Sequence, residues 1–309
     1  MRTIAFTFTM LLAGATLLGE AFANELPPPK HPLELRDGER VAILGGTFVE
    51  RMQIHGYLET LLTAAHPDRD ITFRNLGWSG DNVWGHSRAV FNAPDQGFER
   101  LVRDLKLADP TLVLVHYGEN EAYAGEEGLA KFIEGYNRLL DELKKVSDAR
   151  IVLLGPRLHE DLGPPLPSQY AYNQRLETYI AAMAGIARER DLPFVNLNDV
   201  LPASEAEPLT SNCVHLTPTG YERLATRLMK LFRPDRELDS DYLASEAGEQ
   251  LRQAIIDKNE LFFHRHRPQN ETYLFLFRKH EQGNNAVEVP QFDPLIESKE
   301  EEIKRLRKT

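Results

Sequence analysis

The chain has 309 residues, of which 42% are hydrophobic and 27% are charged. These values are ordinary for a globular protein, and the length accommodates one sizeable α/β domain with an extension. The formal net charge of −11 argues against a nucleic-acid or anionic-membrane partner, because phosphate binding needs a basic face.

The first 23 residues have the pattern of a signal peptide. Arg2 supplies a positive charge, residues 4–18 are mostly apolar, and an Ala-x-Ala cleavage site ends at Ala23. The apolar run is too short to span a membrane comfortably, although a membrane anchor is the alternative. We therefore expect export to the periplasm or the cell exterior, with no membrane contact after cleavage.

A proline-rich linker and a single cysteine characterise the mature chain. We expect it to begin near Asn24, with residues 24–37 as a linker stiffened by three consecutive prolines. Cys213 is the only cysteine, so the exported fold has no internal disulfide and depends on its core. No Cys/His spacing resembles a zinc site, and we expect neither a metal nor a cofactor.

Apolar runs alternate with helical patterns between residues 38 and 232. The expected strands are at residues 40–44, 70–75, 111–117, 151–154 and 193–197. The expected helices are at residues 50–65, 97–107, 128–146, 168–190 and 218–232. This alternation predicts an α/β fold of about five parallel strands between two helical layers, with ligands at the carboxyl ends of the strands.

Residues 233–309 form a C-terminal extension of different character. The region is charged at first, and residues 259–294 then mix aromatic with basic and amide side chains. We favour a mostly helical or irregular flap packed on the core, because aromatic-rich segments usually serve packing. The alternative is a lid whose Arg278, His280 or His264 reaches the site.

Four loops at the expected carboxyl edge carry groups that could converge on one point. Thr47 follows a buried strand and a double-glycine turn, which would hold its hydroxyl near a helix N-terminus. Gly80 could aim its amide at an oxyanion. Asn120 could supply a side-chain amide to the same oxyanion, although asparagine also caps helices. His215 precedes another helix and could act as a base.

Together these positions resemble the SGNH (GDSL-type) hydrolase superfamily over about residues 38–232. Its short blocks match, in order, Gly45-Gly46-Thr47, Asn75 to Gly80, Gly118-Glu119-Asn120-Glu121 and Asn212-Cys213-Val214-His215. The resemblance implies a three-layer, flavodoxin-like fold with Thr47 as nucleophile and His215 as base. It also implies Gly80 and Asn120 as oxyanion donors. Residues 277–295 look like an extension found on an exported bacterial branch of the superfamily.

Two of the three triad positions depart from the superfamily pattern. Thr47 replaces a serine, and its β-branch stiffens the side chain, yet a threonine hydroxyl can be a nucleophile when a base is close. Asn212 replaces the aspartate that normally orients the histidine and stabilises its charged form. Asp199, Glu121 or a backbone carbonyl would then have to orient His215.

A thiol–imidazole pair is a further alternative. Cys213 lies two residues before His215, so the two side chains would share a face if that segment were extended. Free cysteine, however, usually behaves as a small buried apolar residue.

The resemblance implies an exported esterase or carbohydrate O-deacylase that acts on a small-molecule or glycan ester. Trp78, Asp81 and Glu121 are the candidate substrate-binding residues, and Trp78 could form a sugar-stacking surface with Trp84 and Tyr123. The alternative is a hydrolase fold that lost turnover and binds glycan or acyl ligands. A nucleotide or phosphate site is a weaker hypothesis, because the first turn lacks the glycine-rich motifs of such sites. The sequence does not set the oligomeric state.

Overall fold

The structure, a computed structural model, describes residues 33–205, 207–232 and 234–308. Five parallel strands form a sheet in the order β2-β1-β3-β4-β5. The strands are β1 (Arg40–Gly45), β2 (Thr72–Gly77), β3 (Leu112–His116), β4 (Arg150–Gly155) and β5 (Phe194–Asn196). The predicted α/β fold is therefore confirmed. The expected signal peptide and the first part of the linker lie outside the described residues.

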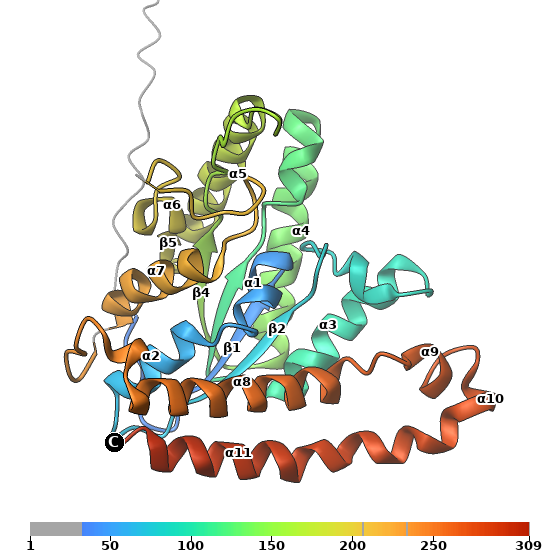
Figure 1. Cartoon of the computed structure of the whole chain (residues 1–309). Coiled ribbons are helices and arrows are strands. Elements are labelled where there is room, and N and C mark those ends of the chain that lie inside the picture. Colours follow the sequence, from blue (N-terminus) through green and yellow to red (C-terminus); the bar gives the residue numbers. More distant parts are fainter. Residues whose placement is uncertain (1–32, 206, 233, 309) are drawn as a thin grey trace, which may run out of the picture.

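Helices cover both faces of the sheet (Figure 1). The helices of the α/β part are α1 (Thr47–Met52), α2 (Tyr57–Ala65), α3 (Pro94–Ala108), α4 (Gly125–Val146), α5 (Tyr170–Glu189), α6 (Leu197–Val200) and α7 (Pro218–Leu228). Those of the extension are α8 (Glu246–His266), α9 (Glu271–Leu274), α10 (Lys279–Gln282) and α11 (Phe292–Leu306). No helix in the described ranges is long and apolar enough to cross a bilayer.

The strands bury side chains on both faces, which explains their near-continuous apolar sequences. In β1, Ala42 and Leu44 join one core cluster with side chains of α3, α4 and α5. Val41 and Ile43 point the other way and join a second cluster with α2 and α7. This alternation follows from the two-residue period of a strand.

The chain order reverses on the two sides of β1. β1 lies between β2 and β3, so the loops that follow β1 and β3 leave the sheet in opposite directions. Such a switch point opens a crevice at the carboxyl ends of the strands, where ligands of open α/β sheets bind. Thr47 follows β1 and Asn120 follows β3, so the fold brings both to this crevice.

The helix predicted over residues 50–65 is divided into α1 and α2. Gly56 lies between them with a φ of +68°, a left-handed conformation that glycine adopts at little cost. A Cβ atom at Gly56 would lie 3.2 Å from Ile256 and 3.4 Å from Ile255. The break therefore provides a surface against which α8 packs closely.

The extension packs along the open edge of the sheet. α8 lies across α2 and the edge strand β2, and α11 runs back beside α8 (Figure 1). Lys258 of α8 is fully buried, and its Nζ donates to Glu59 Oε1 at 2.6 Å and to the Phe73 carbonyl at 3.0 Å. Arg74 of β2 forms an ion pair with Glu300 of α11. These contacts cover an edge that would otherwise be free to pair with other strands.

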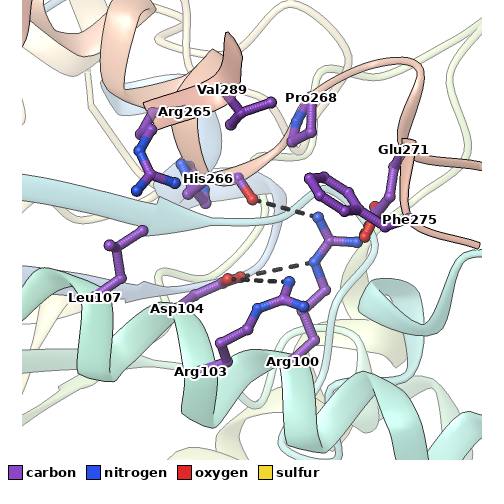
Figure 2. A pocket seen from close by; sticks show the side chains of 10 residues that line it. All are labelled: Arg100, Arg103, Asp104, Leu107, Arg265, His266, Pro268, Glu271, Phe275 and Val289. Carbon is purple, nitrogen blue, oxygen red and sulfur yellow. Dashed lines mark hydrogen bonds and ion pairs between the residues drawn. The ribbon is translucent and has the colours of Figure 1, made fainter. Parts of the chain in front are cut away.

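A second junction joins the extension to α3. Arg100 forms an ion pair with Glu271 and donates to the His266 carbonyl at 3.3 Å (Figure 2). Asp104 lies 3.9 Å from Arg100 Nε. A cavity of about 250 Å³ opens beside these groups, and its walls come from α3 and the extension. None of its lining residues is a candidate site residue.

Candidate active site

The hydroxyl of Thr47 and two amide donors come together at the crevice. Thr47 is the first residue of α1 and is partly exposed. Its Oγ1 accepts a hydrogen bond from the amide of Gly80 at 2.9 Å. Asn120 Nδ2 donates at 2.6 Å to the carbonyl of Asp81, the residue that follows Gly80. The Asn120 side chain makes no helix-capping hydrogen bond, so the structure does not support the capping interpretation.

The loop that carries Gly80 is braced from α1 and from the extension. Glu50 lies one turn after Thr47, and its carboxylate accepts from the amide and the hydroxyl of Ser79, each at 2.7 Å. Arg267, just beyond α8, forms an ion pair with the same carboxylate. The Arg267 guanidinium also lies 3.9 Å from the centre of the Trp78 ring, within the range of a cation–π contact.

Asp81, predicted to bind substrate, is instead part of a buried ion pair. Its Oδ2 accepts from Arg88 Nε at 2.7 Å and from the Tyr117 hydroxyl at 3.0 Å. The side chains of Asp81 and Arg88 are both fully buried. Arg88 also donates to the Leu76 carbonyl at 2.7 Å. Asp81 therefore holds the ends of β2 and β3 together and does not face a ligand.

Glu121, also predicted to bind substrate, joins two of the site loops from within. It is buried, and its carboxylate accepts from the amides of Val83 at 2.8 Å and Gly118 at 2.9 Å. Burial raises the pKa of Glu121 to about 7, although both amides act in the opposite direction. Its position inside the loops indicates a structural role.

The aromatic side chains proposed as a sugar platform differ in exposure. Trp78 is 4% exposed and lies against arginine side chains. Trp84 is half-buried and packs closely on Gly135. Tyr123 is 61% exposed and stacks on Tyr172 with ring centres 4.5 Å apart. Of the three, Tyr123 alone presents a largely open ring.

The loop before α7 places His215 and assigns Asn212 a local task. Asn212 Oδ1 accepts from the backbone amides of Val214 at 3.3 Å and His215 at 2.8 Å. Within the described ranges, no hydrogen bond joins the Asn212 side chain to the imidazole. Asn212 thus stabilises the turn, and the orientation of the His215 imidazole depends on other groups. Thr217 caps α7, and its hydroxyl accepts from the Gly220 amide at 3.1 Å.

Cys213 does not pair with His215 in the way that an extended segment would allow. Its φ is +71°, so the segment turns at this residue, and its side chain is fully buried. The Cys213 carbonyl accepts from the Glu160 amide at 3.0 Å. The thiol therefore has the surroundings of a small apolar core residue.

The electrostatic surroundings of His215 favour its neutral form. Burial lowers the pKa of His215, and the positive charge of Arg51 lowers it further, whereas the charge of Glu119 acts in the opposite direction. Arg51 lies on α1, one turn after Thr47. A neutral imidazole is the form that a general base requires.

Glu119 is the acidic residue that the sequence analysis missed. Burial alone would raise its pKa, but a hydrogen bond from His159 and the nearby histidines lower it overall. Its carboxylate is therefore ionised, and it is one of the charges that act on His215. Asp199, which was proposed for this role, is exposed and accepts from Asn196 at 3.3 Å. The sequence feature that could have identified Glu119 is its position between Gly118 and Asn120, two residues that match the superfamily pattern at the end of β3.

His159 holds Glu119 from the loop after β4. Gln169 Nε2 donates to the Pro167 carbonyl at 2.8 Å, so its Oε1 faces His159 Nδ1 at 3.1 Å. His159 Nε2 faces Glu119 Oε1 at 3.2 Å. Both ring nitrogens of His159 thus lie within hydrogen-bond distance of side-chain oxygens. No set of three or more His, Cys, Asp or Glu side chains in the described part of the chain is placed to hold a metal ion.

The extension reaches the site region through residues other than Arg278 and His280. Arg278 pairs with Glu281, and the His280 side chain is 74% exposed. Arg267 instead contacts the site through Glu50. His264, the third residue of the lid hypothesis, lines a cavity next to α1.

A sequence model of the GDSL-like lipase/acylhydrolase family matches residues 50–223. The chain belongs to this family. The match includes Gly80, Asn120 and His215 but begins three residues after Thr47, so the assignment of Thr47 depends on the geometry described above. No protein of curated function matches the chain.

Two solved structures are similar in fold. An acetyl xylan esterase from Geobacillus stearothermophilus has a TM-score of 0.52 at 18% identity, over 66% of this chain and 99% of that one. A gut microbial diltiazem-metabolizing enzyme has a TM-score of 0.50 at 16% identity, over 66% of this chain and 49% of that one. This chain thus matches about half the length of the second protein.

Proposed function

We propose that this protein is an exported ester hydrolase that acts on small-molecule or carbohydrate esters with Thr47 as its nucleophile. The observation that carries the proposal is the 2.9 Å hydrogen bond between the Gly80 amide and Thr47 Oγ1, with the Asn120 amide bound beside it. A nucleophile with two amide donors next to it is the arrangement that acyl transfer needs. Membership of the GDSL-like lipase/acylhydrolase family supports the same reaction class.

In the proposed reaction, Thr47 Oγ1 attacks the carbonyl carbon of the ester while His215 takes the hydroxyl proton. The tetrahedral intermediate then expels the alcohol, which receives that proton from His215. A water molecule, deprotonated by His215, attacks the acyl-threonine carbonyl. The acid leaves, and Thr47 regains its proton.

The oxyanion of each tetrahedral intermediate would be held by amide donors. In the resting state the Gly80 N–H donates a hydrogen bond to Thr47 Oγ1. When the Oγ1 lone pair forms the new bond to carbon, this N–H would donate its hydrogen bond to the oxyanion instead. Asn120 Nδ2 has a second N–H besides the one that it donates to the Asp81 carbonyl. The backbone N–H of Thr47 would be the third donor.

Glu119 would take over the electrostatic part of the role that an aspartate at position 212 would play. Its ionised carboxylate favours the positive charge that develops on His215 during attack. Arg51 opposes that charge. We therefore expect slower turnover than a carboxylate hydrogen-bonded to the imidazole would give.

The test is hydrolysis of p-nitrophenyl acetate and of an acetylated xylo-oligosaccharide by the chain from Asn24 onward. Thr47→Ala should abolish activity on both esters, whereas Thr47→Ser should retain or raise it because serine lacks the stiff β-branch. Undiminished hydrolysis by Thr47→Ala would exclude Thr47 as the nucleophile.

A binding module without turnover is the second candidate function. The observation that favours it is the commitment of Asn212 Oδ1 to two backbone amides, which leaves His215 without a hydrogen-bonded acid in the described ranges. An aspartate at position 212 could accept the same two amides. This second function would be favoured if the parent chain binds the glycan without hydrolysing it and the double variant Thr47→Ser with Asn212→Asp gains strong esterase activity.

Export is part of the proposal and is tested separately. The signal pattern of residues 1–23 predicts that the secreted or periplasmic chain begins near Asn24. Intact-mass measurement of the chain from a periplasmic extract would check this. A full-length chain retained in the membrane fraction would favour the anchor alternative.

A further inference from the structure

A groove between α1 and α8 adjoins the candidate site. It has a volume of about 540 Å³, within the usual range for ligand sites. Gln53, Ile54 and Ser79 line one wall, and Glu260, Phe263 and His264 of α8 line the other. We refer to it as the α1–α8 groove.

The groove is continuous with the site through two residues. Ser79 lines the groove and directly precedes Gly80, whose amide binds Thr47 Oγ1. Arg51 also lines the groove and acts electrostatically on His215. A substrate whose ester carbonyl lies at Thr47 can therefore extend between α1 and α8.

Two acceptors of the groove, Gln53 Oε1 and the Glu260 carboxylate, lack protein partners in the described ranges, whereas Glu50 is paired with Ser79 and Arg267, and Arg51 adds a positive charge. Gln53 is 8% exposed, and its buried Oε1 has no hydrogen-bond partner among the described residues. Glu260 is exposed and forms no ion pair within those same ranges. A buried acceptor without a donor is costly, so a rotation of the Gln53 amide toward a ligand hydroxyl in the groove would be favoured.

The apolar surface of the groove complements the same kind of ligand. Ile54 is 57% exposed beside the half-buried Phe263. The Arg267 guanidinium lies 5.3 Å from the centre of the Phe263 ring and supports it. A pyranose ring presents both an apolar C–H face and several hydroxyl donors. An acyl chain would leave Gln53 Oε1 unpaired.

We infer that the α1–α8 groove is a subsite for the carbohydrate alcohol portion of the ester substrate. The inference rests on the proposed function, because it assumes that the ester carbonyl lies at Thr47. It also gives the extension a part in substrate selection, since one wall of the groove belongs to α8.

The experiment compares Phe263→Ala and Gln53→Met with a matched control, Gln253→Ala. Gln253 is an exposed residue of α8 that bonds Asp257 at 2.8 Å, outside the groove. Both groove variants should raise KM for acetylated xylotetraose by about 3–10-fold. Their kcat/KM for p-nitrophenyl acetate, which is too small to extend along the groove, should stay within about twofold of the parent. Equal losses on the two esters, or no loss on either, would overturn the inference.

Direct binding separates failure of the subsite from failure of the proposed function. Calorimetric titration of acetylated xylotetraose into Thr47→Ala measures the groove without turnover. A chain that hydrolyses neither ester but binds the tetraose, with affinity weakened by Phe263→Ala, would refute the proposed activity and support the subsite. No binding, or equal binding with and without Phe263→Ala, would refute the subsite.

Discussion

The two halves of the candidate site are held in different ways. In the half formed by Thr47, Gly80 and Asn120, direct hydrogen bonds of 2.6 and 2.9 Å tie the loops to one another. In the half around His215, hydrogen bonds fix the backbone of the loop, and the ring is influenced by the charges of Arg51 and Glu119. The candidate oxyanion donors are thus held by direct hydrogen bonds, whereas no hydrogen bond among the described residues orients the imidazole of His215. Base activation is therefore where we expect turnover to be limited.

The largest effect should come from breaking the oxyanion half. Asn120→Ala removes a side-chain donor, and we expect kcat to fall by about 10²–10³-fold with KM little changed. Steady-state kinetics on p-nitrophenyl acetate would measure this. Asn270→Ala, which removes an exposed amide that bonds Gln282, is the control. A loss smaller than about tenfold would remove Asn120 from the oxyanion site.

A smaller effect should follow when the same half is loosened from outside. Arg267→Ala removes the ion pair to Glu50, so the loop of Ser79 and Gly80 loses one of its braces, and we expect kcat to fall by about tenfold. Arg267→Lys should recover part of the loss because it keeps the charge. Arg265→Ala, whose parent side chain pairs with Asp293, is the matched control. Equal losses in Arg267→Ala and Arg265→Ala would indicate general destabilisation of the extension.

The pH profile tests the half around His215. The base must be neutral, and its pKa is lowered from the ordinary value of 6.5, so kcat/KM should rise with pH to a plateau through a midpoint below 6.5. Arg51→Gln removes a positive charge and should move this midpoint up, whereas Glu119→Gln should move it down. Midpoints that do not move in opposite directions would contradict the assignment of His215 as the base.

The smallest effect on catalysis is expected at Glu121, which joins loops of the oxyanion half. Its folded pKa of about 7 lies above the ordinary value of 4.5, so the folded chain retains a proton that the unfolded chain releases. The free energy of unfolding should therefore fall as pH rises from about 4.5 to about 7, by on the order of 1–3 kcal/mol.

Glu121→Gln, which does not titrate, should lack this fall in urea-denaturation series at different pH values. Glu126→Gln, an exposed change on α4, should retain it. If the dependence on pH is the same in Glu121→Gln and the parent, the fall arises from other groups.

The sequence predicted the sheet, which the structure confirms, and the loops that carry Thr47, Gly80 and Asn120, because both depend on local chemistry. The apolar runs set the strands, and the turns before Thr47 and around Gly80 need the freedom of glycine. Glu119, His159 and the brace from Arg267 were not predicted, because they depend on contacts between distant segments. The burial of Asp81 against Arg88 was not predicted, because a charged residue beside a site has the same sequence signal whether it faces the core or the crevice.

The ion pair between Glu50 and Arg267 has a consequence for the order in which the protein acquires activity. The two residues are 217 positions apart in the chain. The oxyanion loop therefore cannot receive its full bracing until nearly the whole polypeptide has been synthesised and folded. A partly synthesised chain would lack this contact, so full activity would develop only after Arg267 has folded against α1.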